Sequence, residues 1–292
     1  PRDTRALGLK IALGDYFLSL KIAPPTDQVA ISADEVLDCC DRLIELGAAW
    51  AAKDVSNGFV GTPAQLGTLV QARHVRSTVR MRQLEDDNGL NVKPYPPIVQ
   101  DLTAAVELDP RNAALVSLRS LVYWKLARSC DDPLSALMAD KCIADCSRAL
   151  ELHELAKKGK AIGVTGRELK PLPDEAVDVM LRMALCHFVK GEAREGRIAL
   201  QKATEVGPAE DPLLTFLHED AVKAEKAQAL TARGRFQQAT MMLENALERD
   251  PTSMILLAAM RRTEQMQKEA NQQVGTSKIA LQNKQKNVPR KK

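Results

Sequence analysis

Aromatic side chains are scarce in this chain of 292 residues, since Phe, Trp and Tyr make up 3% of it although 45% of its residues are hydrophobic. Runs of β-branched residues, which favour strands, are also few. Ala, Leu, Glu, Lys, Gln and Arg, the strong helix formers, occur throughout. The composition therefore predicts an all-α fold and leaves little sequence from which a sheet could form.

Long apolar runs are missing as well. Segment 7–23 is amphipathic, but Lys10, Asp15 and Lys21 interrupt it, and it is shorter than the about 20 apolar residues of a membrane-spanning helix. No other segment approaches that length. We therefore expect an intracellular protein that is soluble or held peripherally within a complex. The start at Pro1 without a methionine suggests a processed or truncated product, with the mitochondrion as one compartment and the cytoplasm as the alternative.

The sequence contains no motif of a known catalytic centre. Gly-x-Ser-x-Gly, His-Glu-x-x-His and Asp-rich calcium loops do not occur, and the four histidines are dispersed. Residues 159–166 are rich in glycine and basic, yet they lack the Gly-Lys-Ser/Thr ending of a phosphate-binding loop, so we expect a flexible insertion there. A protein without enzymatic activity and without a cofactor is the expectation.

Six cysteines allow either a metal site or free thiols. Cys142, Cys146 and His153 could share one helix face and bind zinc. The paired Cys-x-x-Cys spacing of zinc knuckles is missing, however, as is a regular disulfide framework. Reduced, half-buried thiols and no bound metal are therefore the expected state, in keeping with a reducing compartment.

Two stretches around residues 181–208 and 228–251 carry the same residues at the same spacing. Small residues suit the close approach of two antiparallel helices, glycine suits the turn between them, and proline ends the second helix. The matching positions are Ala184, Gly191, Leu200, Ala203 and Pro208 in the first stretch and Ala227, Gly234, Leu243, Ala246 and Pro251 in the second.

These stretches resemble the tetratricopeptide repeat (TPR), a helix–turn–helix unit of about 34 residues. A third, interrupted copy begins at residues 105–112, continues through Tyr123 and Trp124, and has residues 144–152 as its second helix after a turn lengthened by residues 128–139. The resemblance covers roughly residues 96–270 and implies an α-solenoid of stacked helix pairs.

By that resemblance, the first helix of each pair lines a concave, protein-binding groove. The residues expected to face it are Leu121, Trp124, Leu181, Arg182, Leu185 and Phe188. Because the set is mostly apolar, it suits an amphipathic helix or a hydrophobic segment of another protein subunit. Packing within the solenoid itself is the alternative for each of these residues.

The TPR family also includes co-chaperones, which hold a peptide carboxylate with Asn, Lys and Arg at set positions. Here Leu118 and Asp178 replace the Asn and the Lys, and Arg182 alone matches, so carboxylate binding is disfavoured. Residues 144–205 and a long final helix at about 256–272 also resemble the TPR domain of large immunophilins. The first 92 residues offer no strands for the isomerase domain of those proteins.

A different helical region precedes the repeats. Ser32 or Asp34 can cap a helix through Leu46, and Thr62-Pro63 can start another that runs to about Glu85. The second helix carries a basic stripe that we expect to face solvent, where helical-repeat RNA binding would use it. The stripe consists of Arg73, Arg76 and Arg80.

The end of the chain is basic. It contains no acid after Gly275, so the rest of the chain is mildly acidic although the whole carries a formal charge of +3. A tail of this kind is expected to be disordered and to offer loose contact to phosphate or to an acidic partner. Its basic residues include Lys284, Lys286, Arg290, Lys291 and Lys292.

The sequence thus predicts three regions: a helical N-terminal region (1–92), a TPR-like repeat domain (93–272) and a basic tail (273–292). The predicted function is that of a non-catalytic scaffold, a structural subunit or assembly factor of a larger complex, mitochondrial by one interpretation. A co-chaperone adaptor that binds a client or chaperone peptide is the alternative, and helical-repeat RNA binding is a third.

Overall fold

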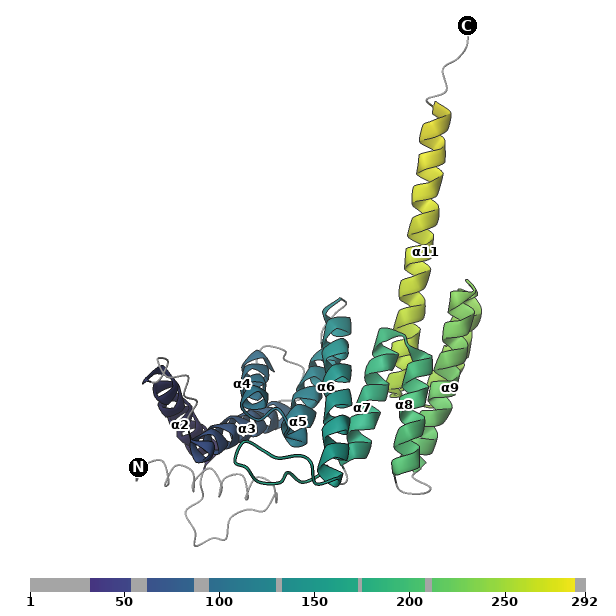
Figure 1. Cartoon of the computed structure of the whole chain (residues 1–292). Coiled ribbons are helices and arrows are strands. Elements are labelled where there is room, and N and C mark those ends of the chain that lie inside the picture. The colour runs from purple at the N-terminus through teal and green to yellow at the C-terminus, as the bar shows by residue number, and fades with distance from the viewer. Residues whose placement is uncertain are drawn as a thin grey trace. The chain divides into compact units, whose positions relative to one another are not determined.

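The computed structural model describes residues 32–53, 62–86, 95–129, 133–172, 175–207 and 212–286. These ranges form ten helices (Figure 1), and the one β-bridge recorded among them, between Ile162 and Glu168, is isolated. The all-α prediction is confirmed. The helices are α2 (Ala33–Lys53), α3 (Pro63–Asp86), α4 (Tyr95–Leu108), α5 (Ala113–Ser129), α6 (Leu134–Lys157), α7 (Glu175–Lys190), α8 (Ala193–Val206), α9 (Pro212–Ala232), α10 (Phe236–Leu247) and α11 (Met254–Lys286).

The chain divides into two compact units, one ending at Arg182 and the other beginning at Met183, within α7. In the first unit each of α2 to α5 packs against the helix that follows it. In the second, α8 packs against α9, α9 against α10, and α11 against both α9 and α10. This packing of sequence neighbours is what stacked helix pairs require. The boundaries at residues 92 and 272 stay a prediction.

Both N-terminal helices begin where the sequence predicts. At the start of α2, Ser32 Oγ accepts the Glu35 N–H at 3.2 Å and a Glu35 carboxylate oxygen accepts the Ser32 N–H at 3.0 Å. Thr62 and Gln65 make the same reciprocal pair at the start of α3. Each is a capping box, which satisfies two of the unpaired N–H groups of a helix start. The helix that starts at Ala33 continues to Lys53, past the predicted end at Leu46.

The two matching stretches form the predicted helix pairs, α7–α8 and α9–α10. Gly191 and Gly234 adopt φ angles of +77° and +71° in the turns, a conformation that favours glycine. Gly191 also leaves room for another helix, because a Cβ added there would lie 2.9 Å from Cγ of Arg262 in α11. The small residues of the pattern are buried, namely Ala184, Ala203, Ala227 and Ala246.

The interrupted copy differs from its prediction. Since α6 begins at Leu134, the long turn expected over residues 128–139 is wrong, and the second helix extends well beyond both ends of residues 144–152. Ser135 Oγ donates to the Ala127 carbonyl at 2.6 Å, which holds the first turn of α6 against the last turns of α5. Arg119 and Asp145 add a two-point ion pair between the same helices, with distances of 2.7 and 2.8 Å.

The last helix continues to Lys286, past residue 272, where the sequence placed its end. Its Ala, Gln and Lys residues are strong helix formers, and no proline occurs before Pro289. Residues 273–286 are therefore helical in the structure. Among the described helices, none combines the length and the apolar character needed to cross a membrane. The amphipathic segment 7–23 lies outside the described residues.

Replacement of Ala246 by Trp tests the helix pairing. Ala246 is 6% exposed and packs with Leu243, Ala227 and Leu256. A larger side chain should overpack this contact and lower the free energy of unfolding by about 1 to 3 kcal/mol. Chemical denaturation followed by circular dichroism measures the loss. Asn245→Trp, at the exposed neighbouring position, is the control and should unfold like the parent chain. Equal stability of all three proteins would contradict the pairing.

Candidate functional site

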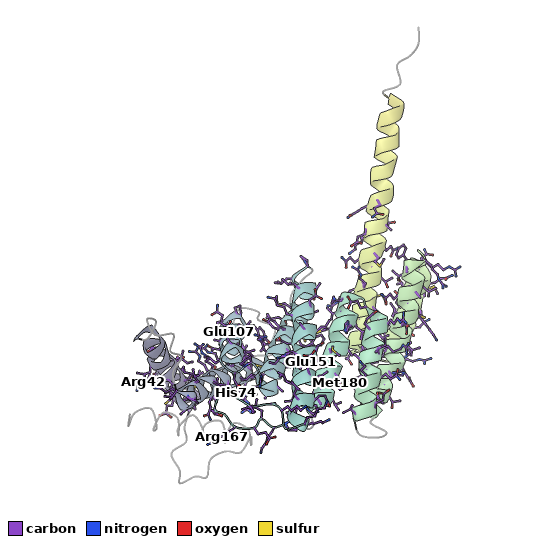
Figure 2. All side chains as sticks on the ribbon, viewed as in Figure 1. Arg42, His74, Glu107, Glu151, Arg167 and Met180 are labelled. Atoms are coloured by element: carbon purple, nitrogen blue, oxygen red, sulfur yellow. The ribbon has the colours of Figure 1, made fainter. Side chains whose placement is uncertain are left out.

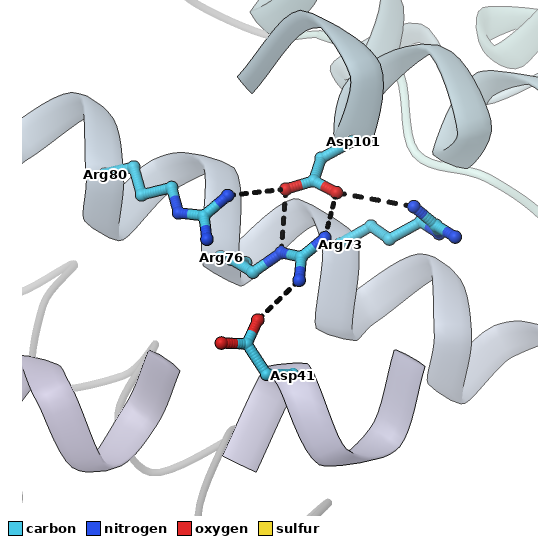
Figure 3. A network of polar contacts seen from close by, with 5 residues as sticks. All are labelled: Asp41, Arg73, Arg76, Arg80 and Asp101. Carbon is cyan, nitrogen blue, oxygen red and sulfur yellow. Dashed lines mark hydrogen bonds and ion pairs between the residues drawn. The ribbon is translucent and has the colours of Figure 1, made fainter. Parts of the chain in front are cut away.

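Three arginines of α3 converge on one carboxylate, that of Asp101 in α4 (Figure 3). Arg76 makes two bonds to it, with Nε donating to Oδ2 at 2.7 Å and Nη2 donating to Oδ1. Arg73 and Arg80 each donate one bond at 3.3 Å. Arg76 also pairs with Asp41 of α2, so these residues, the Asp101 network, join three consecutive helices.

Burial explains why so many cations surround one carboxylate. The Asp101 side chain is 3% exposed, and a charge withdrawn from water in this way is costly unless it is paired and hydrogen-bonded. Burial by itself lowers the pKa of Arg76, but the bonds to Asp101 and Asp41 outweigh it and raise that pKa, so Arg76 stays charged. The expectation that the basic stripe faces solvent is wrong, because the stripe faces α4.

The network holds more positive than negative charge. Arg73 and Arg80 keep 24% and 31% of their side chains exposed, and Arg73 Nε is buried without a hydrogen-bond partner. Three guanidinium groups face two carboxylates, Asp101 and Asp41, within the described residues. The arginines therefore serve first as a structural tie between helices, with only the edges of Arg73 and Arg80 open to solvent.

The predicted groove residues of the first unit fall into two classes. Trp124 is buried at 7% exposure, with the Arg128 guanidinium 5.7 Å from its ring centroid. Leu121 and Leu181 are partly exposed. Arg182 Nη1 donates to the Ser117 carbonyl at 2.9 Å and to Ser120 Oγ at 2.6 Å. These bonds bring the first half of α7 beside α5, the first helix of the preceding pair.

In the second unit, Leu185 is partly exposed and Phe188 is buried at 2% exposure. The Phe188 ring lies over Gly196 of α8, where an added Cβ would be 2.8 Å from the ring, so it belongs to the packing of α7 on α8. Trp124 and Phe188 therefore do not present free side chains to a partner. Their packing was the alternative weighed for each groove residue, and the partly exposed leucines remain candidates.

The remaining predicted basic contacts lie at the end of the chain. Lys284 and Lys286 are in the last turns of α11, and their side chains are outside the described residues. Arg290, Lys291 and Lys292 also lie outside the described residues. A contact to phosphate or to an acidic partner through these five residues stays a prediction.

The glycine-rich segment after α6 is ordered, which corrects the expected flexible insertion. It forms a loop, residues 158–172, that runs back beside α3 and α4 (Figure 1). The Asp109 carboxylate at the end of α4 accepts the Val164 N–H at 3.1 Å, and His153 Nδ1 in α6 accepts the Leu172 N–H at 2.9 Å. Thr165 lies against Gly67 of α3. We refer to residues 158–172 as the basic loop.

Three amides of the basic loop donate to backbone carbonyls of the same loop. Gly163 N–H donates to the Arg167 carbonyl, Gly166 N–H to the Gly163 carbonyl, and Leu169 N–H to the Ala161 carbonyl, at 2.8 to 2.9 Å. A phosphate-binding loop needs such N–H groups free to point at the anion. These three N–H groups are therefore not available to hold a phosphate.

The two cysteines and the histidine that were considered as zinc ligands contact other groups in the structure. Cys142 Sγ and Cys146 Sγ lie 3.9 Å apart and are fully buried, whereas His153 uses Nδ1 for the Leu172 N–H. The hydrogen bond with Cys142, together with burial, raises the pKa of the Cys146 thiol, so this thiol stays protonated. In the described ranges no three His, Cys, Asp or Glu residues come together as metal ligands.

Replacement of Asp101 by Asn tests whether the carboxylate supports the first unit. The amide keeps the shape but leaves three arginines without their shared anion, and removal of one partner from a buried ion pair costs about 3 to 5 kcal/mol. The free energy of unfolding should fall by that amount in urea titrations. The control is Asp41→Asn, because its side chain is 45% exposed and an exposed pair contributes less than about 1 kcal/mol. Equal losses in both variants would contradict this role.

His153, which accepts the Leu172 N–H of the basic loop, should make the stability of the first unit sensitive to acid. Burial, with a smaller contribution from Lys157, lowers the pKa of His153, while Glu154 opposes the change. Below about pH 6.5, the ordinary pKa of histidine, the unfolded chain binds a proton at His153 more readily than the folded chain does. The contribution of neutral His153 to folding stability is therefore complete above that pH and is lost as the pH falls through the lowered pKa of the folded state. Melting temperatures at pH 7.5 and 5.5 should therefore differ more for the parent chain than for His153→Asn, whose Oδ1 can still accept the Leu172 N–H. The same pH dependence in both proteins would contradict the assignment.

No protein-family model matches this sequence, and no curated protein matches it. Among solved structures, the crystal structure of a thermophilic TPR protein from Thermus thermophilus is similar, at 14% sequence identity and a TM-score of 0.40. The alignment covers 88% of this chain and 98% of that chain. This similarity concerns the arrangement of helices alone.

Proposed function

We propose that this chain is a non-catalytic scaffold for protein–protein interaction, a structural subunit or assembly factor of a larger complex. The contact of Arg182 with Ser117 and Ser120 is the observation that carries the proposal. It brings together the first helices of two consecutive pairs, and stacked first helices form the extended binding surfaces of helical-repeat proteins. The mitochondrion as compartment is part of the same proposal.

Partial exposure at this contact supports a docking role. Leu121 and Leu181, the sequence neighbours of Ser120 and Arg182, lie on the two helices joined by the contact and are neither fully buried nor free in solvent. Apolar side chains of this kind can gain further burial when a partner covers them, at about 25 cal/mol per Å² of apolar surface. A hydrophobic segment or amphipathic helix of another subunit is the partner that fits them.

The co-chaperone alternative is less well supported. Arg182 is the one residue that matches the carboxylate-binding pattern, and its guanidinium already donates to a carbonyl and a hydroxyl. Asp178, one turn earlier on α7, is exposed and would repel a peptide carboxylate. RNA binding through the α3 stripe loses support for a similar reason, since Arg76 is committed to Asp101 and Asp41.

A double variant, Leu121→Glu with Leu181→Glu, tests the proposed surface. Charged side chains should disfavour an apolar partner, and loss of an interface hot spot weakens a complex by about 2 kcal/mol or more. The tagged double variant, expressed in the protein's native cells, should therefore no longer co-purify with the proteins that accompany the parent chain. Mass spectrometry quantifies these proteins.

The matched control is Leu134→Glu with Leu137→Glu. It makes the same change at two leucines that are 46% and 49% exposed and lie on α6, which is neither of the two helices joined by the Arg182 contact. Circular dichroism should show that both double variants are folded. Retention of every partner by a folded Leu121/Leu181 variant would reject this surface as the scaffold's binding site.

A further inference from the structure

The basic loop presents cations that have no partner within the described part of the chain. Lys158, Lys160, Arg167 and Lys170 are all exposed, Glu168 is the one acid among residues 158–172, and no ion pair joins these cations to a described carboxylate. Figure 2 shows Arg167 on this loop. The arginines of α3 differ, because their charge is answered by Asp101. The basic loop is therefore a positive surface of the first unit that the fold itself does not neutralise.

The loop is also held in one conformation. Its two sides are joined by the Ile162–Glu168 bridge and by the backbone bonds at Gly163 and Leu169. Asp109, at the end of α4, and His153, in α6, each accept one N–H of the loop and so fix it to these helices. A surface that is already ordered loses little conformational entropy when a partner binds. Its cations can thus act together, although each one alone would contribute little.

An apolar side chain lies among these charges. Ile162 is 51% exposed, and residues opposite each other in an antiparallel bridge share one face, so it stands beside Glu168. Leu155, near the end of α6, is 38% exposed. A partner that used this surface fully would therefore need both negative charge and an apolar group.

We propose that the basic loop docks an acidic segment of a partner polypeptide, one that carries an apolar side chain between its carboxylates. The inference rests on the proposed scaffold function and specifies the chemistry of a second contact. Nucleic acid fits less well, because residues 158–172 contain no aromatic side chain on which a base could stack. The three glycine amides of the loop already donate to backbone carbonyls, so they are not free to bind a phosphate.

Fluorescence anisotropy with the full chain tests the proposal. The probe is a labelled synthetic peptide of Glu residues interrupted by single Leu residues, and a Gln version without charge is its comparison. We expect the Glu peptide to bind with an affinity that falls as salt rises, and the Gln peptide to bind more weakly. The variant Lys160→Glu, Arg167→Glu, Lys170→Glu should weaken binding of the Glu peptide by about tenfold or more. Ile162→Ser should weaken it by about fivefold.

The matched control reverses three exposed charges of the second unit, Lys202→Glu, Arg233→Glu and Arg249→Glu, and should bind the peptide like the parent chain. Equal weakening in the control and loop variants, or no binding of the Glu peptide at all, would overturn the proposal. So would a single-stranded oligo(U) RNA of matched charge that binds more tightly and depends on the same loop residues. The two tests can fail separately, because the Leu121/Leu181 surface is judged by the native proteins that co-purify with the chain and not by binding of this peptide.

Discussion

The buried carboxylate of Asp101 is the constraint on which the first unit depends. It cannot remain charged at 3% exposure without cations beside it, and α3 supplies all three of them. The position of α4 on α3 is therefore fixed by charge as well as by apolar packing. Arg76 extends the same constraint to α2 through Asp41.

The basic loop inherits its position from these helices. Its Val164 N–H is bonded to Asp109, at the end of the helix that carries Asp101, and its Thr165 lies against Gly67, on the helix that carries the arginines. A change in the angle between α3 and α4 would separate the two sites that the loop contacts, Asp109 and Gly67. The network thus acts on the loop without contacting it, since it holds in place the surfaces on which the loop rests.

Local sequence signals predicted a large part of this fold, whereas contacts between distant residues could not be predicted. The Ser32 and Thr62 caps and the Gly191 and Gly234 turns depend on residues only a few positions apart. The order of the loop depends on Asp109, which lies 55 positions from Val164. The resemblance to the TPR placed Phe188 in a groove, but an apolar residue at that position of a first helix can equally belong to the core, so only the packing in the structure separates the two. Likewise, the α3 arginine stripe gives no sign of which helix it faces.

The contact between Gly191 and Arg262 changes how the second unit should respond to strain. In a linear array each helix pair touches only the pairs beside it, so one end can open while the other stays folded. Here the Arg262 side chain of α11 reaches the turn between α7 and α8, although the α9–α10 pair lies between these elements in sequence. The first helix pair and the last helix of the second unit are therefore linked directly by this side chain. Opening of either end must then break contacts at the other, so the second unit is expected to unfold as one cooperative block and not repeat by repeat.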